Sequence, residues 1–235
     1  ALKLSRQYWR LEDQPQRTKF LSLKQGYHGV HFGGLSVNGN TYYRSEYEPL
    51  LSGCFHIDSP WTYRNPYSED PNQLTAAIIT QIERTIQFQG AQTIAAFIAE
   101  PVQGAGGVIV PPSQFWPQLR ALCDNYDILL ISDEVVTGFG RSGSMFGARG
   151  WGVKPDIMCL AKGISSGYVP LGATTINKRM SDAWYKGFSP EGMIMHGFTA
   201  TGHPVACAAA LACLDIVEKE DLPGNAARMG KRLLD

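Results

Sequence analysis

The stretch of sequence that decides the fold is Ile128-Leu129-Leu130-Ile131-Ser132-Asp133-Glu134. After a loop with glycine hinges comes a second apolar run, Asp156-Ile157-Met158-Cys159-Leu160-Ala161-Lys162. Runs this short and this rich in aliphatic side chains are typical of strands buried in a parallel sheet. Asp133 and Lys162 each stand just past the carboxyl end of a predicted strand. Because ligands of open α/β sheets bind at that edge, we expect the two side chains to belong to one site.

An aspartate and a lysine in these positions suit the chemistry of pyridoxal 5'-phosphate (PLP). A lysine amine forms a Schiff base with this cofactor, and a carboxylate beside the pyridine nitrogen keeps that nitrogen protonated. The protonated ring then accepts electrons from a carbanion that forms on the substrate. The spacing of Asp133 and Lys162 is compatible with this chemistry, but a lysine at a strand end is more often a surface residue.

Four stretches around these residues carry a family resemblance: Ile131-Ser132-Asp133-Glu134-Val135, Thr137-Gly138-Phe139-Gly140-Arg141, Ala161-Lys162-Gly163 and Pro170-Leu171-Gly172-Ala173. They resemble the class III aminotransferases, a group of fold-type I PLP enzymes, and the resemblance covers essentially the whole chain. It implies an α/β fold, with a mostly parallel sheet and helices on both faces. Residues 1–235 would form a PLP-binding large domain. Because both ends stop within helical patterns, we expect an N-terminal segment and a C-terminal small domain outside the chain.

The resemblance also implies which residues bind the cofactor. Lys162 would hold PLP as the Schiff base and Asp133 would pair with the ring nitrogen. Tyr27 would stack near one ring face, with His28 as its neighbour, and Val135 would pack on the other face. Judged alone, Tyr27 and His28 would be read as an ordinary turn.

Further cofactor contacts follow from the same resemblance. Glu100 and the glycine loop after it would lie beside the cofactor. Phe198 and Thr199 would also bind it, with Thr199 at the phosphate of the neighbouring subunit, since a hydroxyl and backbone amides in a glycine loop are good phosphate donors. These roles imply a homodimer whose site is shared across the interface.

Two positions bear on the substrates. Family members that use 2-oxoglutarate carry a glutamate where this chain has Ala105, and this glutamate pairs with a mobile arginine. They also carry a glutamine where this chain has Val136, and it reaches the hydroxyl of the cofactor ring. Both differences favour the branch that pairs an amine, a diamine or β-alanine with pyruvate. The resemblance therefore implies an aminotransferase that moves an amino group from a primary amine to an oxo acid, with pyruvate as the expected acceptor. An aminomutase, a decarboxylase or a racemase of the same fold would use the same Lys162 and Asp133.

Two readings from other enzyme classes remain open. Gly163-Ile164-Ser165-Ser166-Gly167 matches the nucleophile elbow of serine hydrolases, but Pro170 and Gly172 oppose the helix that must follow an elbow. The apolar run that ends on Asp133 and Glu134 also resembles a Walker B element, yet the sequence contains no phosphate-binding loop with the Gly-x-x-x-x-Gly-Lys-Ser/Thr pattern. In the aminotransferase reading, Glu134 is a structural carboxylate.

The composition is that of an ordinary globular enzyme. Hydrophobic residues make up 44% of the chain and charged residues 18%, and the formal net charge is +0. This balance argues against nucleic acid or a membrane surface as a partner. The five cysteines include no Cys-x-x-Cys pair, so we expect no disulfide framework and no metal site, and a cytoplasmic location.

The other elements follow from hydrophobic periodicity. From Asn72 to Gln89, apolar residues recur every four positions, which predicts an amphipathic helix on the sheet. Ser113 is the expected N-cap of another helix, and Asn38 to Pro71 is expected to be irregular. The remaining predicted elements are strands at 18–23, 93–99 and 172–177 and helices at 113–125, 178–186 and 205–218.

Overall fold

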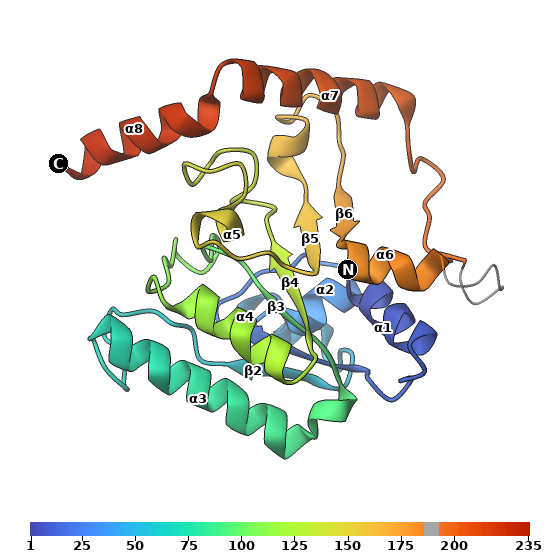
Figure 1. Ribbon diagram of the computed structural model, residues 1–235, viewed down its shortest axis with the longest axis vertical. Coiled ribbons are helices and arrows are strands. Elements are labelled where there is room, and N and C mark those ends of the chain that lie inside the picture. Colours follow the sequence, from blue (N-terminus) through green and yellow to red (C-terminus); the bar gives the residue numbers. More distant parts are fainter. Residues whose placement is uncertain (186–192) are drawn as a thin grey trace.

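A six-stranded sheet in the order β2-β1-β3-β4-β5-β6 lies at the centre of the computed structural model, which describes residues 1–185 and 193–235 (Figure 1). Neighbouring strands are parallel except for β5 and β6, which are antiparallel. The strands are β1 (Lys19–Leu23), β2 (Cys54–Ile57), β3 (Ile94–Ala99), β4 (Leu129–Asp133), β5 (Ile157–Leu160) and β6 (Ala173–Ile176). The predicted α/β class with a mostly parallel sheet is confirmed.

Helices cover both faces of this sheet, as predicted. In chain order the α-helices are α1 (Leu2–Leu11), α2 (Phe32–Val37), α3 (Pro71–Gln89), α4 (Phe115–Asn125), α5 (Gly147–Gly150), α6 (Lys178–Tyr185), α7 (Pro204–Lys219) and α8 (Leu222–Leu234). Short 3-10 helices are η1 (Thr41–Tyr43), η2 (Ser45–Tyr47), η3 (Ala91–Thr93) and η4 (Lys162–Ile164). Among the described helices, none combines the length and the apolar character that a membrane span requires.

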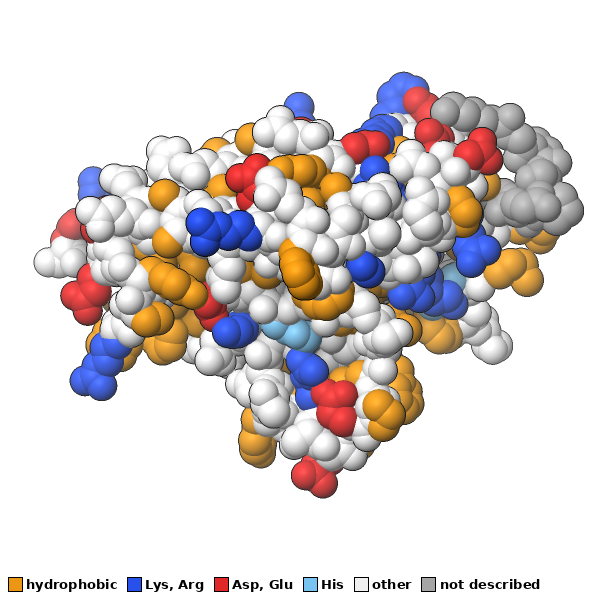
Figure 2. Space-filling model, turned by 90° about the horizontal axis from the view of Figure 1, so that it is seen from below, with side chains coloured by type: hydrophobic (Ala, Val, Ile, Leu, Met, Phe, Trp, Pro, Cys, Tyr) orange, Lys and Arg blue, Asp and Glu red, His pale blue; other side chains and the backbone are white. Residues whose placement is uncertain are grey.

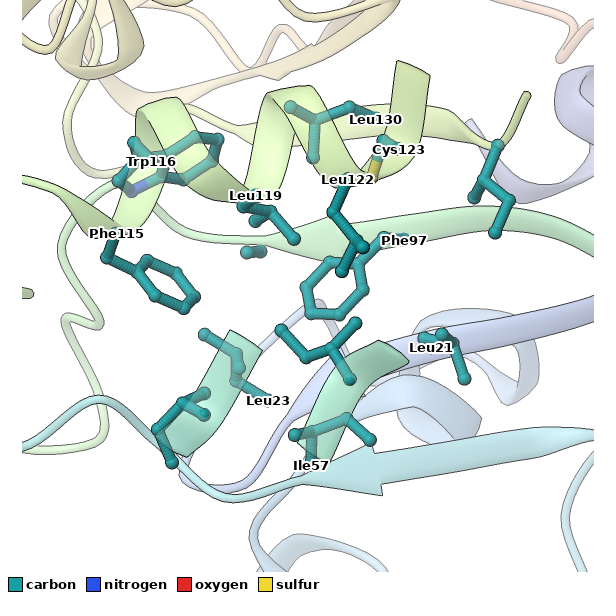
Figure 3. Close-up of a cluster of buried hydrophobic side chains, with 14 of the residues drawn as sticks. Leu21, Leu23, Ile57, Phe97, Phe115, Trp116, Leu119, Leu122, Cys123 and Leu130 are labelled. Atoms are coloured by element: carbon teal, nitrogen blue, oxygen red, sulfur yellow. The ribbon is translucent and has the colours of Figure 1, made fainter. Parts of the chain in front are cut away.

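The main core fills the space between the sheet and helices α3 and α4. Phe97 of β3, Ile57 of β2 and Leu122 of α4 belong to one buried cluster, which Figure 3 shows between the helices and the strands. The four-residue repeat of α3 supplies its inward stripe: Leu74, Ile78, Ile82 and Ile86 are all buried. Because burying one such side chain stabilises a fold by roughly 1.5–3 kcal/mol, this layer fixes the sheet against α3 and α4.

The opposite face is covered by α1, α2 and α6. Trp9 of α1 is fully buried there, and its indole Nε1 donates a hydrogen bond to the Ala95 carbonyl, with 2.8 Å between the two atoms. Phe20 of β1 and Ile131 of β4 belong to the same cluster. The alternation of buried side chains between the two faces is what a strand with helices on both sides requires.

The strand order places a switch point beside β1. The chain leaves β1 and forms β2 on one side of it, then returns through α3 to form β3 on its other side. The intervening helices lie on opposite faces, because α2 packs in the cluster of α1 and α3 packs in the other. At such a point the loops after the two neighbouring strands diverge and leave a crevice at their carboxyl ends. The loops that follow β1 and β3 therefore border a natural binding site.

Asp156 fixes the register between β4, β5 and β6, on the side of the sheet away from β1. Its Oδ2 atom accepts hydrogen bonds from the Leu130 amide and from Arg120 Nη1, both at 2.8 Å. Its Oδ1 atom accepts one from Asn177 Nδ2 at 2.7 Å. One buried carboxylate thus ties the starts of β4 and β5 to the end of β6 and to α4. The resulting register sets Asp133 opposite Cys159.

Some expectations for local structure were wrong. The stretch from Asn38 to Pro71 is not wholly irregular, because it contains the edge strand β2 and the turns η1 and η2. Ser113 does not cap α4, whose N-cap is Gln114 without a side-chain hydrogen bond. Side-chain caps form instead on α2, α3 and α8, and on α3 Asp70 accepts from the amides of residues 72 and 73.

Helices α7 and α8 lie outside the two layers (Figure 1). Ala210 of α7 packs on Leu160 and Ile164, which lie before and after Lys162. The rest of these two helices is largely exposed, including the apolar residues Val205, Leu211, Ile216, Met229, Leu233 and Leu234. On the face drawn in Figure 2, basic and acidic side chains are interspersed, in keeping with the net charge of +0.

Candidate active site

Asp133 and His28 form a buried pair at the carboxyl edge of the sheet. The His28 Nδ1 atom lies 2.8 Å from Asp133 Oδ2, and the two side chains are only 1% and 7% exposed. A carboxylate offers only acceptors, so the contact requires the proton on Nδ1. The other oxygen, Oδ1, accepts a hydrogen bond from the Val135 amide at 3.2 Å. The pair therefore fixes the orientation of the carboxylate and leaves lone pairs on it for a further donor.

Glu100 holds the loop that carries Tyr27 and His28. It stands at the end of β3 and is 6% exposed. Its Oε1 atom accepts from the Tyr27 amide, and its Oε2 atom accepts from the Gly104 amide, both at 2.9 Å. Burial raises the pKa of the Glu100 carboxyl, and these two amide hydrogen bonds oppose that rise. Glu100 thus joins the loops on the two sides of the switch point.

Two buried amides complete this loop, and sequence reasoning missed both. Asn38 accepts from the His28 amide at 2.5 Å and donates to the Gly29 carbonyl at 3.0 Å. Gln103 donates to the Lys24 carbonyl at 2.8 Å and accepts from the Ser59 hydroxyl. An asparagine or glutamine in a loop gives no signal of burial by itself, so these roles could be found only from the fold.

Tyr27 lies half-buried beside this pair. Its ring meets that of Tyr43 edge to face, with 5.2 Å between the centroids. The aromatic contact holds the ring of Tyr27 against η1 and not against the core. Its loop follows β1, on one side of the switch point.

Lys162 begins η4, directly after β5. Its backbone has a φ of 43°, in the left-handed region that is uncommon for a residue with a side chain. The side chain is exposed. In the described part of the chain its amine has no hydrogen bond and no ion pair, so it is available for a covalent bond. Backbone strain of this kind gathers at functional sites.

Glu134 is a structural residue, as interpreted from the sequence. It is 0% exposed and accepts hydrogen bonds from the Ser132 and Thr137 hydroxyls and from the Gly147 and Ala148 amides, at 2.5–3.0 Å. These donors span the whole loop after β4. Glu134 thus anchors the segment that carries Val135.

Val135 and Val136 follow the pair on the same loop. Val135 is half-buried and Val136 is 40% exposed. A Cβ built on Gly104 would lie 3.3 Å from Cγ2 of Val136, so the loops after β3 and β4 touch here. The structure therefore brings Val136 next to the loop of Ala105, the two positions that the sequence singled out for substrate choice.

Phe198 and Thr199 lie apart from this group on an exposed segment before α7. The ring of Phe198 contacts that of His196 with 5.3 Å between the centroids, and its amide donates to the Thr201 hydroxyl at 2.8 Å. These contacts do not involve the His28–Asp133 pair. Phe198 is 76% exposed in this single chain, so its surface is free to meet another molecule.

The hydrolase reading gains no support. The Ser165 hydroxyl donates to the Val169 carbonyl at 2.6 Å, and the residue is 2% exposed. After η4 the chain runs through turns into β6, not into the helix that an elbow requires. Residues 1–185 and 193–235 contain no cluster of three or more His, Cys, Asp and Glu that could hold a metal ion.

Comparisons with known proteins agree with this geometry. A family model described as aminotransferase class-III matches residues 1–235. Putrescine–pyruvate aminotransferase of Pseudomonas aeruginosa is 39% identical over 222 residues, covering 94% of this chain and 48% of that protein. Diaminobutyrate–2-oxoglutarate transaminase of Halomonas elongata is 37% identical over 235 residues, covering 99% and 50%. The chain thus spans about half the length of these relatives.

A solved structure extends the likeness to three dimensions. The amine transaminase from an uncultivated Pseudomonas species, in its PLP-bound form, superposes with a TM-score of 0.97 at 64% identity. The match covers 99% of this chain and 53% of that chain. It confirms the predicted fold-type I architecture.

Proposed function

This chain belongs to the class III aminotransferases, whose cofactor is PLP, and we propose that the protein transfers an amino group from a primary amine to an oxo acid. The observation that carries the proposal is the buried His28–Asp133 pair, with Lys162 just past the neighbouring strand. We further propose that residues 1–235 form the PLP-binding large domain.

The donor set fits this cofactor. Asp133 uses one lone pair toward His28 and one toward the Val135 amide, and a carboxylate offers about four such sites. It can therefore accept a hydrogen from a protonated ring nitrogen as well. Lys162 stands at the same edge with an unpaired, exposed amine, which suits a covalent link. When bound, PLP supplies an aldehyde for that link and an electron-accepting ring.

Asp133 and His28 act on the ring side of the reaction. The carboxylate of Asp133 stabilises positive charge on the ring nitrogen, because opposite charges in a buried site attract strongly. His28 holds that carboxylate through its Nδ1 proton and prevents it from turning toward solvent. Neither residue needs to move during the reaction.

Lys162 acts on the substrate side. With PLP bound, Nζ of Lys162 would be a base, whenever it is not linked to the cofactor, that takes the proton from the amine-bearing carbon of the donor. Tyr27 and Val135 would lie against the cofactor from its two sides, and Glu100 keeps the Tyr27 loop in position. Positioning of this kind supplies a large part of the rate in proton-transfer enzymes.

Pyruvate is the proposed acceptor. The loops of Ala105 and Val136 touch, and neither residue can bind a mobile arginine or a ring hydroxyl as the polar residues of 2-oxoglutarate users do. The name of the Pseudomonas aeruginosa relative supports pyruvate with a diamine donor. The name of the Halomonas elongata relative points to 2-oxoglutarate, so sequence identity does not separate the two acceptors, and the proposal rests on positions 105 and 136.

A homodimer in the cytoplasm completes the proposal. Phe198 and Thr199 are exposed and separate from the His28–Asp133 pair, as expected of residues that reach the site of a neighbouring subunit. The apolar residues exposed on α7 and α8 offer surface for that contact. The five cysteines are all free, which supports a reducing compartment.

The full-length protein loaded with PLP tests the proposal. Borohydride reduction followed by peptide mapping should place the cofactor label on Lys162. In a separate sample that has not been reduced, a primary amine and pyruvate should give alanine. A label on another lysine would remove the assignment of Lys162. Loss of carbon dioxide or inversion of the donor, without amino transfer, would instead indicate a decarboxylase or a racemase.

A further inference from the structure

The reactive Lys162 and Phe139 both have a left-handed backbone conformation. They lie on different loops, which touch at Gly163. Phe139, in the loop after β4, has a φ of 61°, and Lys162 has a φ of 43°. Conformations of this kind cost about 1–3 kcal/mol each and persist only where the surroundings enforce them. The contact between the two loops brings Phe139 to a position where it can enforce the backbone conformation of Lys162.

The contact is made through Gly163. A Cβ built on Gly163 would lie 3.0 Å from Cδ2 and 3.1 Å from Cβ of Phe139, closer than ordinary van der Waals contact. The φ of Gly163 is not positive, so its backbone does not call for glycine. Gly163 is needed for space alone, because the side chain of Phe139 lies directly against its α-carbon.

Phe139 is itself held firmly. Its amide donates to the Met145 carbonyl at 2.6 Å, and its ring meets that of Phe146 edge to face with centroids 5.6 Å apart. Glu134 binds both ends of the same loop through Thr137 and Gly147. The ring is therefore fixed relative to the end of β4, the strand that carries Asp133.

The other side of η4 is held by packing. Leu160 and Ile164 are 7% and 8% exposed and share a cluster with Ala210 of α7, against which Phe139 and Phe146 also pack. Lys162 is thus an exposed residue between two buried ones. The backbone there has Phe139 on one side and α7 nearby, so little freedom remains for it.

We propose that Phe139 is a positioning residue for Lys162, acting through its contact with Gly163. The inference rests on the proposed function, because it assigns Phe139 to the lysine that holds the cofactor. The Phe139 side chain couples the position of the loop after β4, and hence of Asp133, to the position of Lys162 just past β5. It sets the distance between the group that binds the ring nitrogen and the amine that moves the proton.

A double-mutant cycle on the full-length, PLP-loaded protein tests this inference. Gly163→Ala places a methyl group against Phe139, which must give by a few tenths of an ångström. Because a misplacement of about 1 Å can cost roughly 100-fold in rate, we expect this smaller shift to lower kcat several-fold, with little change in KM. Phe139→Gly suits the left-handed backbone and removes the clashing atoms. It should lower kcat by itself, yet cost several-fold less when Gly163→Ala is already present, because contacting residues couple.

Phe115→Leu is the control. It alters a buried ring of the main core that is neither in the cluster of Phe139 nor among the nearest atoms to Gly163, so its effect and that of Gly163→Ala should multiply. A second measurement is the pH midpoint of the visible absorption of the lysine-bound cofactor. This midpoint should move in Gly163→Ala and Phe139→Gly and stay in place in Phe115→Leu.

The outcomes separate the inference from the proposed function. A borohydride label away from Lys162 in the unchanged protein would contradict the proposed function. A label on Lys162, together with independent effects of Phe139→Gly and Gly163→Ala, would overturn the positioning role alone. If Gly163→Ala does not fold, Phe139→Leu is compared with Phe115→Leu: a lower kcat with a shifted midpoint only in Phe139→Leu supports the role, and equal effects overturn it.

Discussion

His28 and Asp133 stand 105 residues apart in the sequence, and their side chains meet with 2.8 Å between Nδ1 and Oδ2. The two loops that bring them together follow β1 and β4, which are separated in the sheet by β3. Because both side chains are almost fully buried, the contact is shielded from solvent and salt. It therefore sets the direction in which Asp133 presents its remaining lone pairs.

Removing the charge of Asp133 should reduce turnover far more than it reduces binding of the cofactor. Asp133→Asn keeps the shape but cannot stabilise a protonated ring nitrogen, so we expect cofactor to remain bound and kcat to fall by several orders of magnitude. His28→Ala loses one hydrogen bond to a charged group, worth about 1.5–3 kcal/mol, and should lower kcat by roughly 10- to 100-fold. His28→Asn, which can donate from nearly the same position, should recover part of that loss. Steady-state kinetics with one amine and pyruvate measure all three, and near-normal turnover in Asp133→Asn would refute the role.

The choice between pyruvate and 2-oxoglutarate should depend on residues 105 and 136, in the loops after β3 and β4. Ala105→Glu combined with Val136→Gln supplies an anion for a mobile arginine and a polar contact near the ring. We expect the ratio of kcat/KM for 2-oxoglutarate to that for pyruvate to rise at least tenfold, about 1.4 kcal/mol. Ala105→Gln with Val136→Gln lacks the charge and should shift the ratio less. Val110→Gln, at a valine that is 60% exposed, controls for the substitution itself. An unchanged ratio, or a ratio that already favours 2-oxoglutarate tenfold, would contradict the assignment of pyruvate.

Glu134 should matter for stability more than any surface acid. In Glu134→Gln, an amide NH2 replaces one of the oxygens that accept from two hydroxyls and two backbone amides. The hydroxyl and the backbone amide that donated to that oxygen then face an NH2 group, which cannot accept a hydrogen bond. We expect the free energy of unfolding to fall by roughly 2–3 kcal/mol. Urea unfolding of the full-length protein measures the loss. Glu69→Gln, at an exposed residue, should have almost no effect, and equal losses in the two variants would show that the network contributes little.

The stability of the fold should depend on pH through His56. Burial, followed by the nearby guanidinium of Arg44, lowers the pKa of His56 from 6.5 to about 4. Above pH 6.5 the folded and unfolded forms are both neutral. Below it the unfolded form takes up a proton first, so the free energy of unfolding decreases as the pH falls from 6.5 toward 4.

Replacing His56 tests this dependence directly. His56→Asn should flatten the decrease between pH 6.5 and pH 5, measured by urea unfolding at each pH. His203→Asn, at an exposed histidine, should leave the slope as it is. Parallel slopes in the native protein and His56→Asn would show that His56 does not cause the effect.

The elements that the sequence predicted well are those whose pattern is complete within a few residues. β3 and β4 are buried along their whole length, and their unbroken apolar runs indicated this. The repeat of isoleucines in α3 likewise marked a single buried stripe. β2 was missed because Cys54-Phe55-His56-Ile57 shows neither alternation nor an apolar run. Only its last residue is buried, as suits an edge strand.

For the site, the sequence located the residues at strand ends and missed those that hold them. Asp133 and Lys162 could be placed because each follows a recognisable strand. The roles of Asn38 and Gln103 could not be predicted, because they depend on which loops meet. That depends on the order of the strands, which no local sequence pattern indicates. The contact of Phe139 with Gly163 is hidden for the same reason. The exposure of Lys162 could not be derived from the sequence, because burial depends on everything that packs over a strand end, not on the strand itself.

The position of β1 between two later strands also governs how the chain assembles. Lys19 of β1 lies opposite Ile94 of β3, so this edge of β1 stays unpaired until the chain has grown past β3. At about 5–20 residues per second, synthesis takes roughly 4 to 15 seconds to cover that interval. Pairings of such long sequence separation are slow to form even in the finished chain. Newly made chains should therefore carry an open apolar strand for seconds.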